Sequence, residues 1–232
     1  MENLVRGLIS EILKEPKPRF DVDEFACLVT KTNRATGSFG VYIYSLSKLE
    51  EHLQSKSKDK NDDLFVIAGV ECGLPHKNFG KCNNALQVKF SASNPLYKAG
   101  PLAYEIAMWK SGGLSPDRGA VSSSAKNVWK KYSLRSDVES APFDDVSQPV
   151  TPDPDDDCRL HNPKGATIDK RSYLNKSYRR SQSPPSYLFD LEKNNQTGFE
   201  LYKKENPSAT EENFSRYVVT NFTSLFSRRY GD

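Results

Sequence analysis

The apolar residues of this chain fall into short runs that are separated by polar, turn-forming stretches. Four of these runs are rich in β-branched and aromatic residues, which favour strands. We expect the last two at the centre of one sheet, because a strand buried on both faces reads as a nearly continuous apolar run. The predicted strands are Phe25–Lys31, Phe39–Ser45, Leu64–Cys72 and Ala85–Ala92.

Three helices are predicted among and after these strands, over residues 46–56, 99–110 and 123–132. The last of these follows Ser122-Ser123, and a serine at that position caps a helix by accepting a backbone N–H bond. The fourth strand leads almost directly into the second helix, so a tight strand-to-helix turn lies between them.

Two further amphipathic segments lie near the ends of the chain. Glu2–Glu15 has apolar residues at helical spacing and is followed by "PKP", which ends a helix. Near the other end, Ser208 and Glu211 have the spacing of a capping box, and a largely aromatic helical face follows them. Both segments are predicted to be helices that dock on the rest of the protein.

The segment between the core pattern and the last helix is polar. Residues 137–157 carry eight acidic residues and no lysine or arginine, and the sign of the charge reverses over residues 164–180. Such a stretch buries too little apolar surface to fold alone. The pattern predicts an α/β fold of the α+β kind, with a mixed central sheet flanked by helices. Its parts are an N-terminal helix (1–19), an α/β core (20–143), a polar irregular region outside that core (144–186) and a C-terminal helical extension (187–232).

Composition narrows the class of protein. The chain has 232 residues, 36% of them hydrophobic, and a net charge of +3, which is too mild to indicate nucleic acid by itself. No apolar run approaches the roughly 20 residues of a membrane span, so no membrane partner is expected. The N-terminus lacks a secretory pattern, and we expect an intracellular protein. Its four cysteines show no CxxC spacing and are expected to be free thiols.

Metal binding is not expected. Cys72, His76 and Cys82 would lack a fourth zinc ligand, and their spacing matches no common structural site. The acidic run that begins at Asp153 lacks the glycine of an EF-hand loop and has Lys164 at the twelfth position. It is interpreted as a solvated loop.

The order of elements from Phe25 to Phe143 resembles the GNAT acetyltransferase fold. Within it, "PLYKAGPLAYEIAMW" (95–109) and "GLSPDRGAVSSSAKNVWKKY" (113–132) are similar to an acetyltransferase-like family encoded by tailed bacteriophages. The resemblance implies an acyl-CoA-dependent N-acyltransferase that uses acetyl-CoA. It also implies a location in the host cytoplasm or in the virion.

In that family, a loop and helix start after a strand bind the pyrophosphate of coenzyme A. The resemblance places this site at Lys98, Ala99, Gly100 and Leu102. A helix start suits an anion because its first N–H groups are unpaired and its dipole end is positive. Here, however, Lys98 stands where the family has glycine, and Pro95 stands where it has arginine or glutamine. We therefore expect weak coenzyme A binding or none.

The resemblance also implies the catalytic candidates. The family's later helix carries a tyrosine that protonates the departing thiolate, but Trp129 occupies that position, and an indole N–H is no general acid near neutral pH. Tyr132, one turn further on, is the substitute. Glu71, near the end of a predicted strand, is a candidate base toward an amine; a solvent-facing strand carboxylate is the alternative interpretation.

A second function of a different class stays open. A non-catalytic virion-associated or head-packaged protein would use the fold for structure or for nucleic-acid binding. Ile9-Ser10-Glu11 and Leu13-Lys14-Glu15 fit the trimming rule of some tailed-phage head proteins, which makes phage head proteins candidate partners. Basic residues interleaved with tyrosines suit a nucleic-acid backbone, or they neutralise the preceding acidic segment. The nucleic-acid candidates are Lys170, Arg171, Lys176, Arg179 and Arg180.

Overall fold

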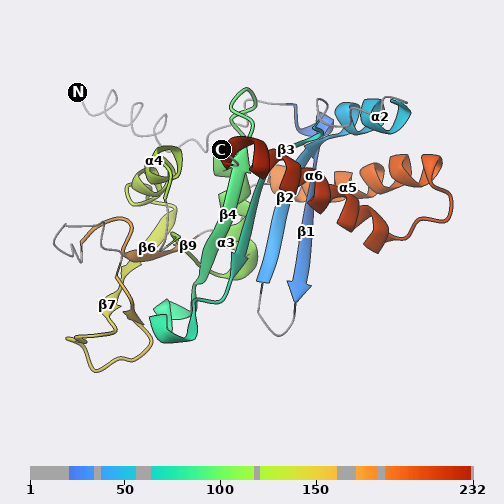
Figure 1. Ribbon diagram of the computed structural model, residues 1–232. Coiled ribbons are helices and arrows are strands. Elements are labelled where there is room, and N and C mark those ends of the chain that lie inside the picture. Colours follow the sequence, from blue (N-terminus) through green and yellow to red (C-terminus); the bar gives the residue numbers. More distant parts are fainter. Residues whose placement is uncertain are drawn as a thin grey trace, which may run out of the picture.

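A computed structural model describes residues 21–33, 38–55, 64–117, 121–160, 171–181 and 186–230. The predicted N-terminal helix and the trimming sites lie outside these residues. The mixed α/β class is confirmed, because one seven-stranded sheet with strand order β1-β2-β3-β4-β5-β9-β6 is flanked by helices (Figure 1). Its strands are β1 (Phe25–Asn33), β2 (Ser38–Ser45), β3 (Val66–Gly73), β4 (Leu86–Ser93), β5 (Leu114–Ser115), β6 (Val138–Pro142) and β9 (Lys176–Arg180).

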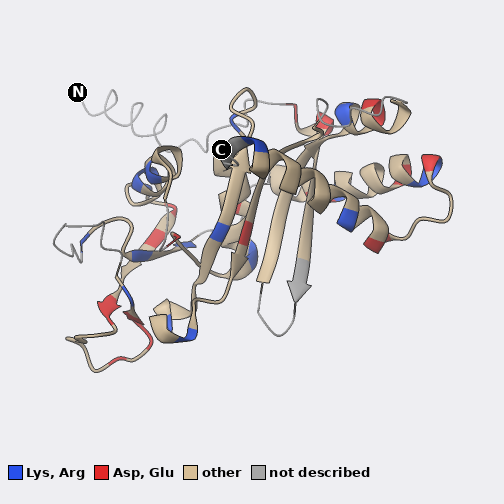
Figure 2. Cartoon of the chain, in the orientation of Figure 1, with Lys and Arg blue, Asp and Glu red and all other residues tan. Residues whose placement is uncertain are grey.

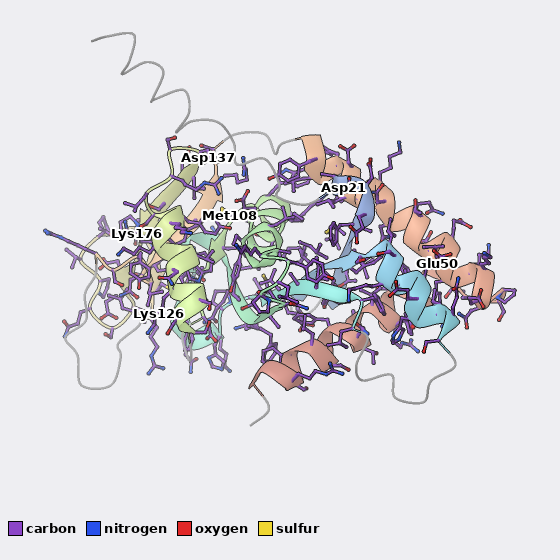
Figure 3. All side chains as sticks on the ribbon, turned by 90° about the horizontal axis from the view of Figure 1, so that it is seen from above. Asp21, Glu50, Met108, Lys126, Asp137 and Lys176 are labelled. Atoms are coloured by element: carbon purple, nitrogen blue, oxygen red, sulfur yellow. A yellow bond between two sulfur atoms is a disulfide. The ribbon has the colours of Figure 1, made fainter. Side chains whose placement is uncertain are left out.

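The helices lie in layers on both sides of β1 to β4. Figure 3, seen from above, places α6 on one side of the sheet and α3 and α5 on the other. Each side buries its own apolar cluster against the strands. The helices are α2 (Leu46–Gln54), α3 (Gly100–Ser111), α4 (Ser123–Tyr132), α5 (Ser186–Glu205) and α6 (Glu211–Tyr230). None of these described helices combines the length and the apolar character that crossing a bilayer requires.

The sheet changes character at β4. From β1 to β4 every neighbouring pair is antiparallel, whereas β5 runs parallel to β4 and pairs with it only at Leu86 and Gln87. Within the described part of the chain, residues 88–93 of β4 have a partner strand on one side only. β5 in turn pairs with β9 at one position, Leu114 with Tyr178. The β6–β9 half of the sheet therefore diverges from β4 and leaves an open strand edge.

The sequence interpretation of residues 144–186 as irregular and outside the core is wrong for β9. Tyr178 is fully buried between β5 and β6, although it lies in a strongly basic stretch.

In place of the single predicted C-terminal helix there are two helices, α5 and α6, and α6 begins later than expected. Its cap is formed by Thr210 and Asn213, because the backbone N–H of each residue donates to the side-chain oxygen of the other. Ser208 and Glu211 do not form the expected box, because the helix starts at Glu211 itself.

The prediction of four free thiols is also wrong. Cys82 and Cys158 form a disulfide across 76 residues, whereas Cys27 and Cys72 are free and buried. The bridge joins the 3-10 turn η3 (Cys82–Asn84), between β3 and β4, to β8 (Asp157–Cys158), which pairs with β7 (Asp144–Asp145). The chain packs closely there: a Cβ on Gly80 would lie 2.2 Å from the Asp157 carbonyl oxygen. Because the two cysteines are distant in sequence, only the fold brings them together.

The disulfide predicts a simple thiol count. Denatured without reductant, the protein should expose two reactive thiols, and after reduction all four of its cysteines should react. Replacing both bridged cysteines by serine should lower the free energy of unfolding by roughly 2–4 kcal/mol, because the unfolded chain gains freedom. Denaturant titration with and without reductant measures this, and the double variant should be insensitive to reductant. Four reactive thiols before reduction would contradict the bridge.

Candidate functional site

A cavity of about 560 Å³ opens beside the unpaired edge of β4. Ser91 and Ser93 of β4 form one wall, the start of α3 closes one end, and α4 forms the opposite wall. Lys98, Gly100 and Tyr132, three of the residues selected from the sequence, line this cavity together. Ala99 and Leu102 are buried beside it and are not lining residues.

The start of α3 presents an uncapped helix end to the cavity. Ala99 makes no side-chain cap, and Pro101 occupies the first turn, so the N–H groups of Gly100 and Leu102 have no partner within the helix. A Cβ on Gly100 would lie 2.9 Å from the Ser93 hydroxyl oxygen. A larger residue here would displace the Ser93 side chain, so the helix approaches β4 closely at Gly100.

Lys98 adopts a backbone conformation that favours glycine. Its φ is +52°, in the left-handed region that favours glycine and costs other residues about 1–2 kcal/mol. Weak coenzyme A binding or none is predicted because Lys98 stands in place of a glycine. The main chain nevertheless makes the turn that a glycine favours, and the exposed side chain adds a positive charge at the rim of the cavity.

Tyr132 is buried on the cavity wall, and its hydroxyl donates a hydrogen bond to the carbonyl oxygen of Pro101 at 2.8 Å. This bond ties the end of α4 to the first turn of α3. Burial raises the pKa of Tyr132 well above its usual value, so the phenol keeps its proton at neutral pH. Trp129 packs edge-on against Tyr104, with ring centroids 5.2 Å apart, and its indole belongs to the core.

Three charged residues of the cavity wall were not selected from the sequence, namely Glu105, Lys131 and Arg135, and two of them belong to a buried ion-pair network. Glu105 of α3 is buried and accepts hydrogen bonds from Arg135, which follows α4, and from Arg180 of β9 at 3.0 Å. Arg135 also bonds Asp137, and the hydrogen bond from Arg135 lowers the pKa of that carboxyl. A signal was present: Glu105 is the one charged residue between Ala99 and Trp109, and a lone carboxylate on an apolar helix needs a partner.

Glu71 is not brought to this cavity. It does not line it, and its carboxylate accepts a hydrogen bond from the Tyr42 hydroxyl at 2.8 Å. That bond and the negative charge of Glu71 add to burial in raising the pKa of Tyr42. The geometry favours a structural contact between β2 and β3 over a catalytic base for Glu71.

The basic residues proposed for nucleic acid do not form one exposed surface. Arg180 has a side chain only 3% exposed and is bound in the ion-pair network of Glu105. Arg179 is exposed, but its guanidinium donates to the Asn83 carbonyl. Arg171 is exposed, Lys176 is half-buried, and Lys170 lies outside the described residues. Figure 2 shows acidic residues of the β7–β8 region on the same part of the molecule.

Three carboxylates gather at β7 and β8. Asp144, Asp156 and Asp157 bring oxygen atoms within 4.8 Å of one another. Asp144 also accepts backbone N–H bonds from Val150 and Thr151, so it orders the loop that follows it. The acidic segment is thus held by its own carboxylates and by the disulfide next to them.

Comparison with known proteins finds no matching family model, no matching curated protein and no matching solved structure. The chemistry of the cavity therefore has to be understood from its own residues.

The buried network predicts that replacing Glu105 destabilises the protein much more than replacing Glu192, whose ion pair is partly exposed. Glu105→Gln should lower the free energy of unfolding by about 3 kcal/mol, because Arg180 would keep its charge and lose its main partner. The control is Glu192→Gln, whose ion pair with Lys110 is partly exposed and should cost about 1 kcal/mol or less. Urea unfolding of both variants measures the difference. Equal, small effects would show that Arg180 is not held by Glu105.

Proposed function

We propose that the cavity beside β4 binds an acyl-coenzyme A and that the protein is an N-acyltransferase of the GNAT type. One observation carries the proposal: Lys98 and Gly100, chosen from one motif, and Tyr132, chosen from another, line a single cavity at an open strand edge. The parallel β4–β5 pair, which joins for two residues and then diverges, supports the same interpretation.

The residues present fit the cofactor in three respects. The uncapped start of α3 offers backbone N–H groups and a positive dipole end to a pyrophosphate. Lys98 and Lys131 add positive charge around the same cavity. The unpaired edge of β4 offers backbone donors and acceptors to an extended chain that contains amides, as an added strand would.

When bound, the cofactor supplies the acyl group as a thioester, whose C–S bond breaks as the acceptor's C–N bond forms and whose sulfur takes up a proton. Tyr132 carries a proton on its hydroxyl oxygen at the cavity wall, as a phenol does at neutral pH, and burial raises its pKa, which makes it a weaker acid than usual. The hydroxyl donates that proton to the carbonyl of Pro101, and it would turn from this bond to serve the sulfur. Glu105, neutralised by two arginines, places no net repulsion near the phosphates.

The non-catalytic alternative is favoured by a different observation. Glu71, the candidate base, lies away from the cavity and is occupied by Tyr42. A protein that keeps the ligand cavity without a base would act as a binding module. Virion association and phage head partners stay predictions, since their sequence signals lie outside the described residues.

Binding is predicted to depend on the lysine that faces the cavity. Calorimetric titration with acetyl-coenzyme A should give measurable binding that Lys131→Ala weakens about ten-fold or more, since one charged hydrogen bond contributes about 1.5–3 kcal/mol. Lys130→Ala is the matched control, because Lys130 is adjacent but does not line the cavity. Gly100→Val should abolish binding in a protein that remains folded by circular dichroism. Equal affinity in all variants would contradict the assigned site.

Catalysis is predicted to depend on the Tyr132 hydroxyl. Tyr132→Phe should slow thiol release from acetyl-coenzyme A, in the presence of mixed primary amines, by about 10²-fold or more, while its affinity for the cofactor stays within about two-fold. The control is Tyr97→Phe, because Tyr97 precedes α3 without lining the cavity. A wild-type protein that binds acetyl-coenzyme A but releases no thiol would favour the binding module.

A further inference from the structure

A second cavity, of about 490 Å³, lies directly beside the first. The two share four lining residues on three elements, so they are immediate neighbours. The shared residues are Ser91, Tyr104, Ser122 and Ala125. At this junction the Tyr104 hydroxyl and the Ser91 hydroxyl are hydrogen-bonded at 2.8 Å.

The second cavity differs from the first in chemistry. Its walls come mainly from Val88 and Phe90 of β4, Val121 before α4, Trp129 of α4 and Phe226 of α6. Phe90 is 49% exposed although it packs edge-on against Phe226. Aromatic and aliphatic groups therefore surround a space that the described residues leave open, which is typical of a site for an apolar ligand group.

Two charged residues also line this space, and the ammonium group of one is already bonded. Lys89 donates to the Gln87 side-chain oxygen at 2.7 Å. Its pKa is lowered by burial, which the negative charge of Asp117 partly offsets. The two opposite charges leave no net charge, so the cavity favours a neutral occupant.

We infer that the second cavity holds the acyl chain of the donor and that this chain is apolar and several carbons longer than acetyl. The inference rests on the proposed function, since it assumes that coenzyme A occupies the first cavity. A water molecule takes up about 30 Å³ of liquid, and a methyl group has a similar size, so acetyl would leave most of the space empty. Trp129, which replaces the expected tyrosine of the family, supplies part of the apolar wall.

The test compares acyl-coenzyme A thioesters that differ only in chain length. Calorimetry with acetyl-, butanoyl-, hexanoyl- and octanoyl-coenzyme A should show affinity rising by up to about four-fold for each added methylene group until the cavity is filled. We expect at least a ten-fold gain between acetyl and hexanoyl. Constant or falling affinity along the series would overturn the inference and would assign the space to the acceptor instead.

Two valine variants test in which cavity the preference for longer acyl chains arises. Val121 lines only the second cavity and Val128 only the first. Val121→Phe should remove the preference for long chains and leave acetyl-coenzyme A affinity within about two-fold, whereas Val128→Phe should weaken all thioesters alike. A length preference that survives Val121→Phe would contradict this location. If the wild-type protein binds no thioester at all, the proposed function is overturned as well. Binding without a length preference overturns only the inference about the second cavity, so the two outcomes are distinguishable.

Tryptophan fluorescence gives a readout that does not require turnover. The protein has two tryptophans, and Trp109→Phe leaves Trp129 as the only one. In that variant, hexanoyl-coenzyme A should change the emission of Trp129, and acetyl-coenzyme A should change it much less. Equal spectra with both thioesters at saturation would show that the longer chain does not reach the second cavity.

Discussion

The buried Glu105 ion-pair network holds the two halves of this sheet together. The backbone ladder is weak at that point, since β4 and β5 share two residue pairs and β5 and β9 share one. Glu105 of α3 binds Arg180 of β9 and Arg135 beyond α4, which connects three elements across the divergence. A buried charge that loses its partner is strongly destabilising, so the network permits few other arrangements.

The cavity follows from that arrangement. The β6–β9 pair is joined to β4 by side chains more than by backbone hydrogen bonds, because β5 links them over only a few residues. The pair therefore diverges from β4 and leaves residues 88–93 of that strand without a partner on this side. Tyr132 joins α4 to the start of α3 by its bond to the Pro101 carbonyl, and the Trp129 ring packs at a tilt against Tyr178 with ring centroids 5.1 Å apart. Both residues of α4 are buried in the core, and Tyr132 also lines the first cavity while Trp129 lines the second.

The candidate site was partly predictable. Lys98 and Gly100 could be selected because a strand followed by a glycine-containing helix start is a local pattern. The partners of Glu105 could not be identified, since Arg135 and Arg180 lie 30 and 75 residues away. Glu71 was selected for its position near a strand end. Its bond to Tyr42 depends on the register between β2 and β3, which single-sequence patterns do not specify.

The sequence by itself determined the identity of β1 to β4 and of α2, α3 and α4, because each is specified by local signals within about a dozen residues, such as a run of strand-forming residues or a helix cap. Only the tertiary structure decided that β9 inserts between β5 and β6, and that Cys82 meets Cys158. The same holds for the two cavities beside β4. These features depend on contacts between distant segments, where burial of Tyr178 outweighs the polar character of its neighbours along the chain.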